Sequence, residues 1–262
     1  MKKLLSGKWA LVTGASSGLG SDFARILASM GAHLVISARR EELLNLLKSE
    51  IQKQYQIEVL VIPMDLSIED APVRIFQFLK SKKIELDILI NNAGFAVFGD
   101  FADLSWEKES QMLRLDILAL VNMTKLFLKS GSYNKKRYIL QLASIAAFQP
   151  SPMYASYSAA KSFVLNFSLA IRNELRKTSI SCTALCPGVT RTEFFDVAEQ
   201  KVTFFQRITM MDSQAVARAG IKAMLKRRSL IVPGIMNKIM ALLTRFVSRP
   251  LQAKLARLFV QG

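Results

Sequence analysis

Two side chains suited to acid/base chemistry lie four positions apart in the segment Tyr157-Ser158-Ala159-Ala160-Lys161. Residues at this spacing share one face of a helix, which places the ammonium beside the phenol. A free tyrosine has a pKa near ~10, and a close positive charge lowers that pKa toward the range in which the phenol exchanges protons at neutral pH. The spacing therefore predicts a proton-transferring Tyr157 that is assisted by Lys161.

A glycine-rich turn near the N-terminus has the character of an anion site. The apolar run Trp9–Val12 leads into Thr13-Gly14-Ala15-Ser16-Ser17-Gly18-Leu19-Gly20, and apolar residues at helical spacing follow. This is a strand-loop-helix pattern. Glycines let the backbone approach a pyrophosphate at the helix N-terminus, where unpaired N–H groups and the helix dipole favour anions.

Histidine and cysteine usage excludes several kinds of site. His33 is the only histidine and precedes the chemical motifs, so we interpret it as a strand-edge residue and expect neither a His-based hydrolase nor a metal site. Cys182 and Cys186 lie four apart on a predicted strand, too far apart for a disulfide. We interpret both as small core residues of a protein kept in a reducing compartment, the cytoplasm by default, since Met1-Lys2-Lys3-Leu4-Leu5 does not resemble a signal peptide.

Strands and helices are predicted to alternate along one domain. Strands are predicted at 9–12, 33–37, 58–62, 87–90, 138–142, 180–185 and 230–232, and helices at 41–54, 69–80, 105–130, 157–177 and 213–227. Near-continuous apolar strands such as Ile88-Leu89-Ile90 suit a parallel sheet covered on both faces. The chain has 262 residues, of which 51% are hydrophobic, and that is enough for one α/β domain with a substantial core.

The order and spacing of five motifs resemble the short-chain dehydrogenase/reductase family, and in particular its general bacterial reductases. The motifs are the turn at 13–20, Asn91-Asn92-Ala93-Gly94, Ser144, Tyr157 with Lys161, and Pro187-Gly188. The resemblance covers roughly residues 5–195. It implies a three-layer Rossmann fold in which a doubly wound parallel sheet of about seven strands carries a hydride-transfer site at the C-terminal ends of its strands.

The resemblance also implies roles for individual residues. Tyr157 would protonate the substrate oxygen, Lys161 would bind the nicotinamide ribose as well as tune Tyr157, and Ser144 would hydrogen-bond the substrate. Thr192, with the apolar Phe194 and Phe195, would begin a substrate lid. The cofactor-binding residues it implies are Gly14, Ser16, Ser17, Gly18, Leu19, Gly20, Asp65, Asn91, Ala93, Gly94, Tyr157, Lys161, Pro187, Gly188, Val189, Thr190 and Thr192.

The residues after the second predicted strand favour NADP over NAD. A carboxylate at that place would bind the 2′-hydroxyl of NAD and repel a 2′-phosphate, but Ala38 stands there and Arg39 follows. Arginine presents a fork of donors that matches phosphate oxygens. The alternative interpretation is that Arg39 and Arg40 only solvate the start of the next helix.

One position departs from the family pattern. Asp116 falls where the family usually has an asparagine that bends the helix and completes a proton relay. An ionised aspartate accepts hydrogen bonds but cannot donate them, and its charge opposes formation of a nearby phenolate. We expect Asp116 to belong to the catalytic group and to alter the pH profile without abolishing activity.

The C-terminal end of the chain is strongly basic. The formal net charge is +16, and from Phe205 onward eleven Lys or Arg residues face the single acid Asp212. Residues 235–247 have apolar side chains at helical period, and Pro250 separates them from 251–259. We divide the chain into a catalytic domain at 1–234 and a basic amphipathic extension at 235–262. This extension suits an anionic membrane surface, or alternatively a cover over the pocket or a subunit contact. It lacks the aromatic platform typical of nucleic-acid binding.

These features together predict an NADP-dependent oxidoreductase that interconverts a carbonyl and an alcohol on a fairly apolar small molecule. Two alternatives stay open. One is a reductase of 3-oxoacyl thioesters on acyl-carrier protein or coenzyme A, and the other is a non-catalytic NADP-binding interaction or sensor protein. We further expect a homo-oligomer.

Overall fold

A computed structural model describes residues 4–198, 200 and 202–261 of the chain. Its centre is a parallel sheet in the order β3-β2-β1-β4-β5-β6-β7. The strands are β1 (Trp9–Thr13), β2 (His33–Ala38), β3 (Val59–Pro63), β4 (Ile88–Asn91), β5 (Arg137–Leu142), β6 (Ile180–Leu185) and β7 (Leu230–Ile231). The strand order reverses between β1 and β4, and ligands of such sheets bind beyond the carboxyl ends of the strands at this point.

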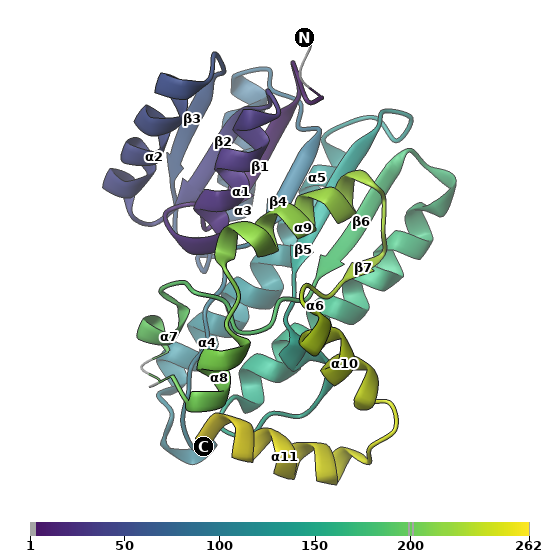
Figure 1. Cartoon of the computed structure of the whole chain (residues 1–262). Helices are drawn as coiled ribbons and strands as arrows, with labels where there is room; N and C mark the ends of the chain where they lie inside the picture. Colours follow the sequence, from purple (N-terminus) through teal and green to yellow (C-terminus); the bar gives the residue numbers. More distant parts are fainter. Residues whose placement is uncertain (1–3, 199, 201, 262) are drawn as a thin grey trace.

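Helices cover both faces of the sheet and give three layers (Figure 1). One face carries α1 (Gly18–Ser29), α2 (Glu41–Gln54) and α9 (Ser213–Leu225), and the other carries α3 (Ala71–Ser81), α5 (Leu120–Lys129) and α6 (Ala155–Glu174). Every residue of β4 and β6 is buried, as expected for a parallel strand covered on both faces. The three-layer Rossmann prediction is confirmed.

The predicted helix at 105–130 is interrupted in the structure. It begins with α4 (Trp106–Leu113), continues as the π-helical segment η2 (Arg114–Ala119) and ends with α5. A π-helical turn inserts one residue into the α-helical repeat and re-aims the side chains around it. The turn contains Asp116, the position at which the family resemblance implies a bend.

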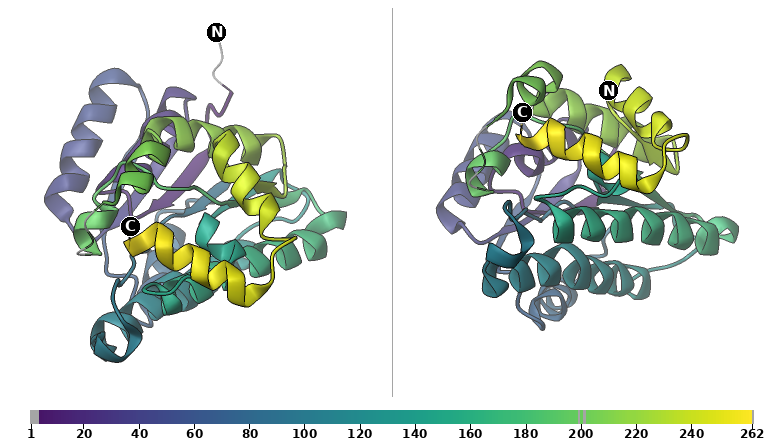
Figure 2. Two further views of the ribbon diagram at one scale, coloured as in Figure 1. Left: turned by 60° about the horizontal axis from the view of Figure 1, so that its bottom comes forward. Right: turned by 90° about the horizontal axis from the view of Figure 1, so that it is seen from below.

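Most of the remaining short elements lie beyond the carboxyl ends of the strands (Figures 1 and 2). They are η1 (Phe101–Asp103), η3 (Ile145–Phe148), α7 (Phe194–Val197), α8 (Phe204–Thr209), α10 (Ile235–Leu243) and α11 (Arg249–Gln261), whereas η4 (Leu175–Lys177) follows α6. The predicted extension begins where α10 begins. Its last residue Gly262 and the basic start Met1–Lys3 lie outside the described residues.

The residues interpreted as structural pack as expected. Cys182 and Cys186 are buried free thiols. His33 is the first residue of β2, stacks on Trp9 with 5.0 Å between ring centroids, and accepts a hydrogen bond at Nδ1 from the backbone N–H of Glu58. Within the described part of the chain, none of the helices has both the length and the apolar character needed to cross a bilayer.

Candidate active site

Two adjoining cavities occupy the carboxyl end of the sheet. The first, of about 310 Å³, lies over the glycine-rich turn, and the second, of about 180 Å³, lies over Ser144, Tyr157 and Lys161. Six residues line both cavities: Leu19, Asn92, Gly94, Leu142, Thr192 and Phe194. The anion site and the acid/base group predicted from the sequence therefore face one continuous space.

The glycine turn is held in place by close backbone packing. A Cβ on Gly20 would lie 2.0 Å from the carbonyl oxygen of Gly14, so no other residue fits there without displacing the turn. The side-chain amide of Asn92 donates to the carbonyl oxygens of Thr13 at 2.9 Å and Gly14 at 3.2 Å. The predicted cofactor residues that line this first cavity are Gly14, Ser16, Ser17, Gly18, Leu19, Gly20, Arg39, Asp65, Ala93, Gly94 and Thr192.

Asn91 is placed differently from the expectation. Its buried side chain donates to Gln141 at 2.9 Å and Thr124 at 3.1 Å, which ties β4 to β5 and α5 instead of facing the first or second cavity. The neighbouring Asn92 lines both cavities. Because successive side chains of a strand point to opposite faces, one step along the chain separates the structural asparagine from the one at the site.

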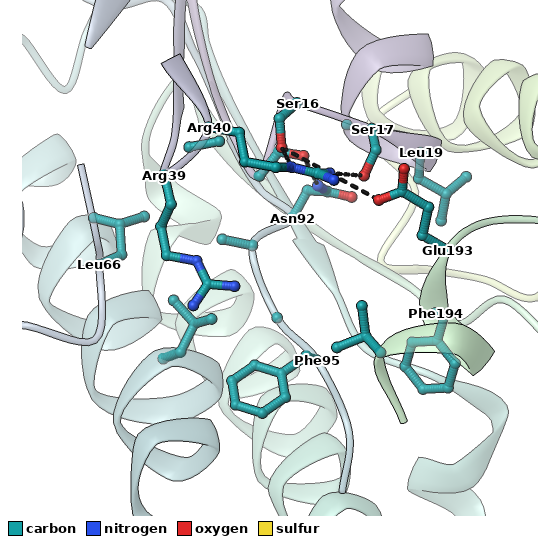
Figure 3. A pocket seen from close by; sticks show the side chains of 18 of the residues that line it. Ser16, Ser17, Leu19, Arg39, Arg40, Leu66, Asn92, Phe95, Glu193 and Phe194 are labelled. Carbon is teal, nitrogen blue, oxygen red and sulfur yellow. Dashed lines mark hydrogen bonds and ion pairs between the residues drawn. The ribbon is translucent and has the colours of Figure 1, made fainter. Parts of the chain in front are cut away.

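The two arginines after β2 take separate directions (Figure 3). Arg40 donates to Oγ of Ser17 at 2.9 Å and pairs with Glu193 at 2.8 Å, which links the glycine turn to the loop after β6. Arg39 extends along the first cavity on the side of Leu66 and Phe95. Its guanidinium has no hydrogen bond or ion pair to another of the described residues.

The acid/base group comes from two elements that meet at the second cavity. Tyr157 and Lys161 lie on α6, and Ser144 follows β5. Lys161 Nζ donates to the carbonyl oxygen of Leu142 at 3.3 Å and lies 5.5 Å from the centroid of the Tyr157 ring. Of the predicted nicotinamide-side residues, Pro187, Gly188, Val189, Thr190 and Thr192 line the same cavity.

The environment of Tyr157 corrects the expectation that its pKa is lowered. Burial is the largest cause and raises the pKa of Tyr157 above its ordinary value, the charge of Asp116 raises it further, and a hydrogen bond with Ser144 acts in the opposite direction. Cys186 adds a smaller increase. The physical reason is that burial disfavours the charged phenolate and the carboxylate of Asp116 adds a like charge nearby.

That carboxylate belongs to Asp116, which lies behind the cavities instead of lining them. Its Oδ2 is 2.7 Å from Lys161 Nζ, and both side chains are buried. Its Oδ1 accepts the backbone N–H of Phe95 at 3.2 Å, and the carboxylate packs against Gly94. Burial, the largest cause, raises the pKa of Asp116, while Lys161 and the Phe95 N–H lower it. Asp116 is thus a partner of Lys161, held by the π-helical turn.

The loop after β6 and the C-terminal helices close the second cavity. Phe194 lies with its ring centroid 5.6 Å from that of Tyr157, and Thr192 packs against Gly18. Asn237 of α10 packs against Gly188, where a Cβ would lie 2.4 Å from its amide atoms. Met240, Ala256, Phe259 and Val260 complete the lining. The interpretation of the extension as a cover over the pocket therefore agrees with the structure.

Several lining residues were not predicted from the sequence. Tyr154 hydrogen-bonds Gln200, whose amide donates to the carbonyl oxygen of Val260 at 3.3 Å. Glu193 and Arg40 form the link described above. Tyr154 lies three residues before Tyr157, and this spacing is the only sequence feature that could have identified any of these residues. Their other contacts depend on how loops fold back over the site.

The first cavity fits a nicotinamide dinucleotide. It combines the N-terminus of α1, a turn that admits no Cβ at Gly20, and a cation at the end of β2. A diphosphate needs such backbone donors and close approach. The second cavity continues toward Tyr157, where a reacting ring would lie.

Comparisons with known proteins agree with this geometry. The family model described as short chain dehydrogenase matches residues 8–203. A solved short-chain dehydrogenase from Sphingobium yanoikuyae in complex with NADPH superposes with a TM-score of 0.79 at 26% identity, covering 92% of this chain and 97% of that one.

Three curated relatives are similar in sequence. An uncharacterized oxidoreductase, YvaG, of Bacillus subtilis is 31% identical over 82% of this chain and 80% of its own length. The 17-beta-hydroxysteroid dehydrogenase type 3 of Mus musculus is 34% identical over 75% of this chain and 65% of its own length. The very-long-chain 3-oxoacyl-CoA reductase of Laccaria bicolor is 34% identical over 67% of this chain, which spans about half (52%) of that relative's length. With its sheet order, its joined cavities and these matches, the chain belongs to the short-chain dehydrogenase/reductase family of oxidoreductases.

Proposed function

We propose that the protein is an NADP-dependent oxidoreductase that interconverts a carbonyl and an alcohol on an apolar small molecule. The observation that carries the proposal is that Tyr157, Ser144 and Lys161 line a cavity continuous with the one over the glycine turn. A dinucleotide held at that turn would supply or accept the hydride. The remaining chemistry is a proton transfer at the substrate oxygen.

Tyr157 is the proposed general acid and base. Its burial keeps the phenol protonated over the neutral range, which suits protonation of a carbonyl oxygen as charge develops on it. Ser144 is close enough to Tyr157 for a hydrogen bond and would orient the same substrate oxygen. Lys161 would hold the nicotinamide ribose. Asp116 would position the ammonium of Lys161, since its Oδ2 lies 2.7 Å from Lys161 Nζ.

The preference for NADP rests on Arg39. It extends along the cavity, where the adenosine side of a dinucleotide would lie, and Ala38 brings no carboxylate to that place. Arginine recognises phosphate through paired donors. Asp65, held in its own turn by two hydrogen bonds from Ser67 at 2.9 and 2.7 Å, would face the adenine.

The lining of the second cavity supports an apolar substrate. Phe194, Phe195, Met240 and Phe259 surround the space beyond Tyr157, and pockets of this composition bind apolar groups through burial of their surface. Two of the relatives are named for a steroid and for a long 3-oxoacyl chain. A 3-oxoacyl thioester is therefore the second candidate, and the basic surface would suit an acidic carrier protein or coenzyme A.

Tyr157→Phe tests the proposal. NADPH oxidation should first be screened against bulky ketones, aldehydes and 3-oxoacyl thioesters. With the best substrate, the variant should lose about 10²–10⁴-fold in kcat, the contribution typical of general acid catalysis, while its NADPH Kd stays unchanged. Tyr138→Phe, in β5 and away from both cavities, is the matched control and should keep full activity.

Two results would contradict the proposal. Equal turnover of Tyr157→Phe and the wild type would remove the proton-transfer role. Tight NADPH binding without turnover in the whole screen, together with a cellular activity that Tyr157→Phe leaves intact, would favour the non-catalytic NADP-binding alternative.

A further inference from the structure

The amphipathic helix α10 has its apolar side turned away from the protein. Its polar residue Asn237 is 2% exposed, whereas Ile235 is 78% exposed and Ile239 is 46% exposed. Phe246, in the turn after α10, is 79% exposed. A helix that packs only on its own protein buries its apolar stripe, so α10 presents this stripe to something outside the chain.

Helix α11 extends the same surface. Leu251, Leu255 and Leu258 are exposed, while Gln252 and Ala256 on its inner side are buried. Figures 1 and 2 show α10 and α11 together at one end of the molecule, beyond the sheet. We call this set the C-terminal apolar surface; its members are Ile235, Met236, Ile239, Leu242, Leu243, Phe246, Leu251, Leu255 and Leu258. Nine exposed apolar side chains on two neighbouring helices and the turn between them favour an interaction site here.

Cations without anions accompany the apolar surface. Lys238, Arg245, Arg249 and Lys254 are exposed on the same two helices and the turn between them, and the sequence contains no Asp or Glu after Asp212. In a two-fold contact between copies, the same patch faces itself, which would bring these cations together. An anionic lipid surface instead accepts both the apolar stripe and the cations that border it.

The inner faces of the same helices line the substrate cavity. Met240 from α10 and Ala256, Phe259 and Val260 from α11 reach the space beyond Tyr157. A hydrogen bond from Thr203 to the carbonyl oxygen of Phe259 at 3.3 Å connects α11 to the start of α8. One pair of helices thus has the outer apolar surface on one side and the wall of the pocket on the other.

We propose that the C-terminal apolar surface docks on an anionic lipid bilayer, and that the substrate is an apolar carbonyl or alcohol dissolved in that bilayer. The docking stands on the exposed side chains and charges alone. The source of the substrate rests also on the proposed function, since it requires that Tyr157 acts on an apolar molecule.

Vesicle flotation of the full chain tests the docking. The wild type should float with vesicles of phosphatidylcholine containing about 30 mol% phosphatidylglycerol, and should stay in solution with phosphatidylcholine alone. Ile239→Asp/Phe246→Asp should weaken vesicle binding by about tenfold or more, because it places charge in the apolar stripe. Leu46→Asp/Ile68→Asp, at exposed apolar positions elsewhere, is the matched control and should bind like the wild type.

A second pair of variants separates local charge from the net charge of +16. Lys238→Gln/Arg245→Gln should bind anionic vesicles more weakly than Lys53→Gln/Lys80→Gln, although both remove two charges. Equal binding by the two would overturn the assigned surface. So would a wild type that stays in solution with both vesicles, or a wild-type oligomer that Ile239→Asp/Phe246→Asp dissociates in the absence of lipid, which would assign the surface to a second copy.

Kinetics test the source of the substrate separately. With an apolar ketone presented in anionic vesicles, Ile239→Asp/Phe246→Asp should raise the apparent KM by about tenfold, whereas its KM for a water-soluble ketone should equal that of the wild type. If the wild type turns over neither ketone, the result would count against the proposed function and not against docking. Equal KM values in vesicles for variant and wild type would overturn the lipid source.

Discussion

Asp116, Tyr157 and Lys161 are all buried, and the charge of Asp116 adds to the burial that raises the pKa of Tyr157. The ion pair of Asp116 and Lys161 is 2.7 Å long, and Lys161 Nζ lies 5.5 Å from the centroid of the Tyr157 ring. Tyr154 and Cys186 are the other titratable groups near Tyr157. Interacting groups of this kind titrate as a set. A pH profile of this enzyme would therefore report the set and not one residue.

Replacing Asp116 with Asn should move the pH profile. The charge of Asp116 adds to the burial that raises the pKa of Tyr157, so its removal should lower that pKa, and the freed ammonium of Lys161 should lower it further. In the proposed mechanism, alcohol oxidation uses the phenolate of Tyr157 as base. The rising limb of kcat/KM for oxidation should accordingly shift to lower pH, as measured over a full pH series.

The control for this prediction is Asp87→Asn. Asp87 is also a buried aspartate that pairs with lysines, at 3.0 Å from Lys8 and 3.2 Å from Lys135, but it lies at the opposite end of the sheet. Its replacement should leave the profile in place. An Asp116→Asn profile that overlays the wild type would show that the carboxylate does not act on Tyr157.

Arg39→Ala should weaken NADPH binding selectively. Hydrogen bonds to a charged group contribute about 1.5–3 kcal/mol, so Kd for NADPH should rise by about tenfold to a hundredfold, while Kd for NADH stays the same. Arg40→Ala is the comparison, because it breaks the contacts with Ser17 and Glu193 and should affect both cofactors alike. Similar losses for NADPH and NADH in Arg39→Ala would remove the argument for NADP.

At this scale the sequence predicts side-chain chemistry better than side-chain direction. Tyr157, Lys161 and Ser144 meet as expected because two elements carry them to one edge of the sheet. Asn91 instead bonds within the fold and Asn92 lines the cavities, because successive side chains along a strand point to opposite faces. The pKa of Tyr157 could not be predicted from spacing, since it depends on burial and on Asp116, which is 41 positions away in sequence.

At the scale of elements, the junction of β1 and α1 has the least room for change. Gly20→Ala would place a Cβ 2.0 Å from the backbone oxygen of Gly14, and relief requires the turn to shift. We expect a loss of about 3 kcal/mol in the free energy of unfolding, the upper end for an overpacked site, and loss of NADPH binding. Thermal denaturation and fluorescence titration measure the two effects.

Gly7→Ala provides the comparison. Gly7 has a positive φ, of 74°, and a Cβ there would meet nothing within 4 Å. The variant should lose only about 1 kcal/mol from the left-handed backbone and should bind NADPH like the wild type. A Gly20→Ala protein with wild-type NADPH affinity would contradict the tight turn.

Regular elements follow closely from the sequence pattern. The helix predicted at 41–54 has these bounds in the structure, and the strand at 180–185 does too. An amphipathic period marks the helix, and a short run of apolar and small residues marks the strand. The π-helical turn at Arg114–Ala119 breaks one predicted helix. Its cause is tertiary: the turn directs Asp116 toward Lys161, a contact that no local pattern records.

At the scale of the whole molecule, the outward side of α6 offers a second apolar surface. Phe163 and Leu169 are 41% and 38% exposed, and Phe163 stacks on Phe167 with centroids 5.8 Å apart. We expect a homo-oligomer that buries this side. Light scattering should give a mass of at least twice 29.3 kDa for the wild type, and Phe163→Arg should lower it.

Leu46→Arg is the control for the assembly. Leu46 is 66% exposed on α2. An arginine at this position adds the same charge as Phe163→Arg, but away from α6. The variant should keep the wild-type mass, as should Ile239→Asp/Phe246→Asp on the C-terminal apolar surface. A Phe163→Arg protein of unchanged mass would exclude α6 from the subunit contact.

The contact of Asn237 with Gly188 has a thermodynamic consequence. It seats α10 directly on a turn that lines the second cavity, so a shift of the helix on lipid would alter the place where the cofactor is proposed to bind. Linkage is reciprocal: the factor by which vesicles change the Kd for NADPH must equal the factor by which NADPH changes the Kd for vesicles. NADPH binding would then change the affinity of the protein for the bilayer. The fraction of the protein that carries NADPH would in turn influence the fraction that is bound to the bilayer.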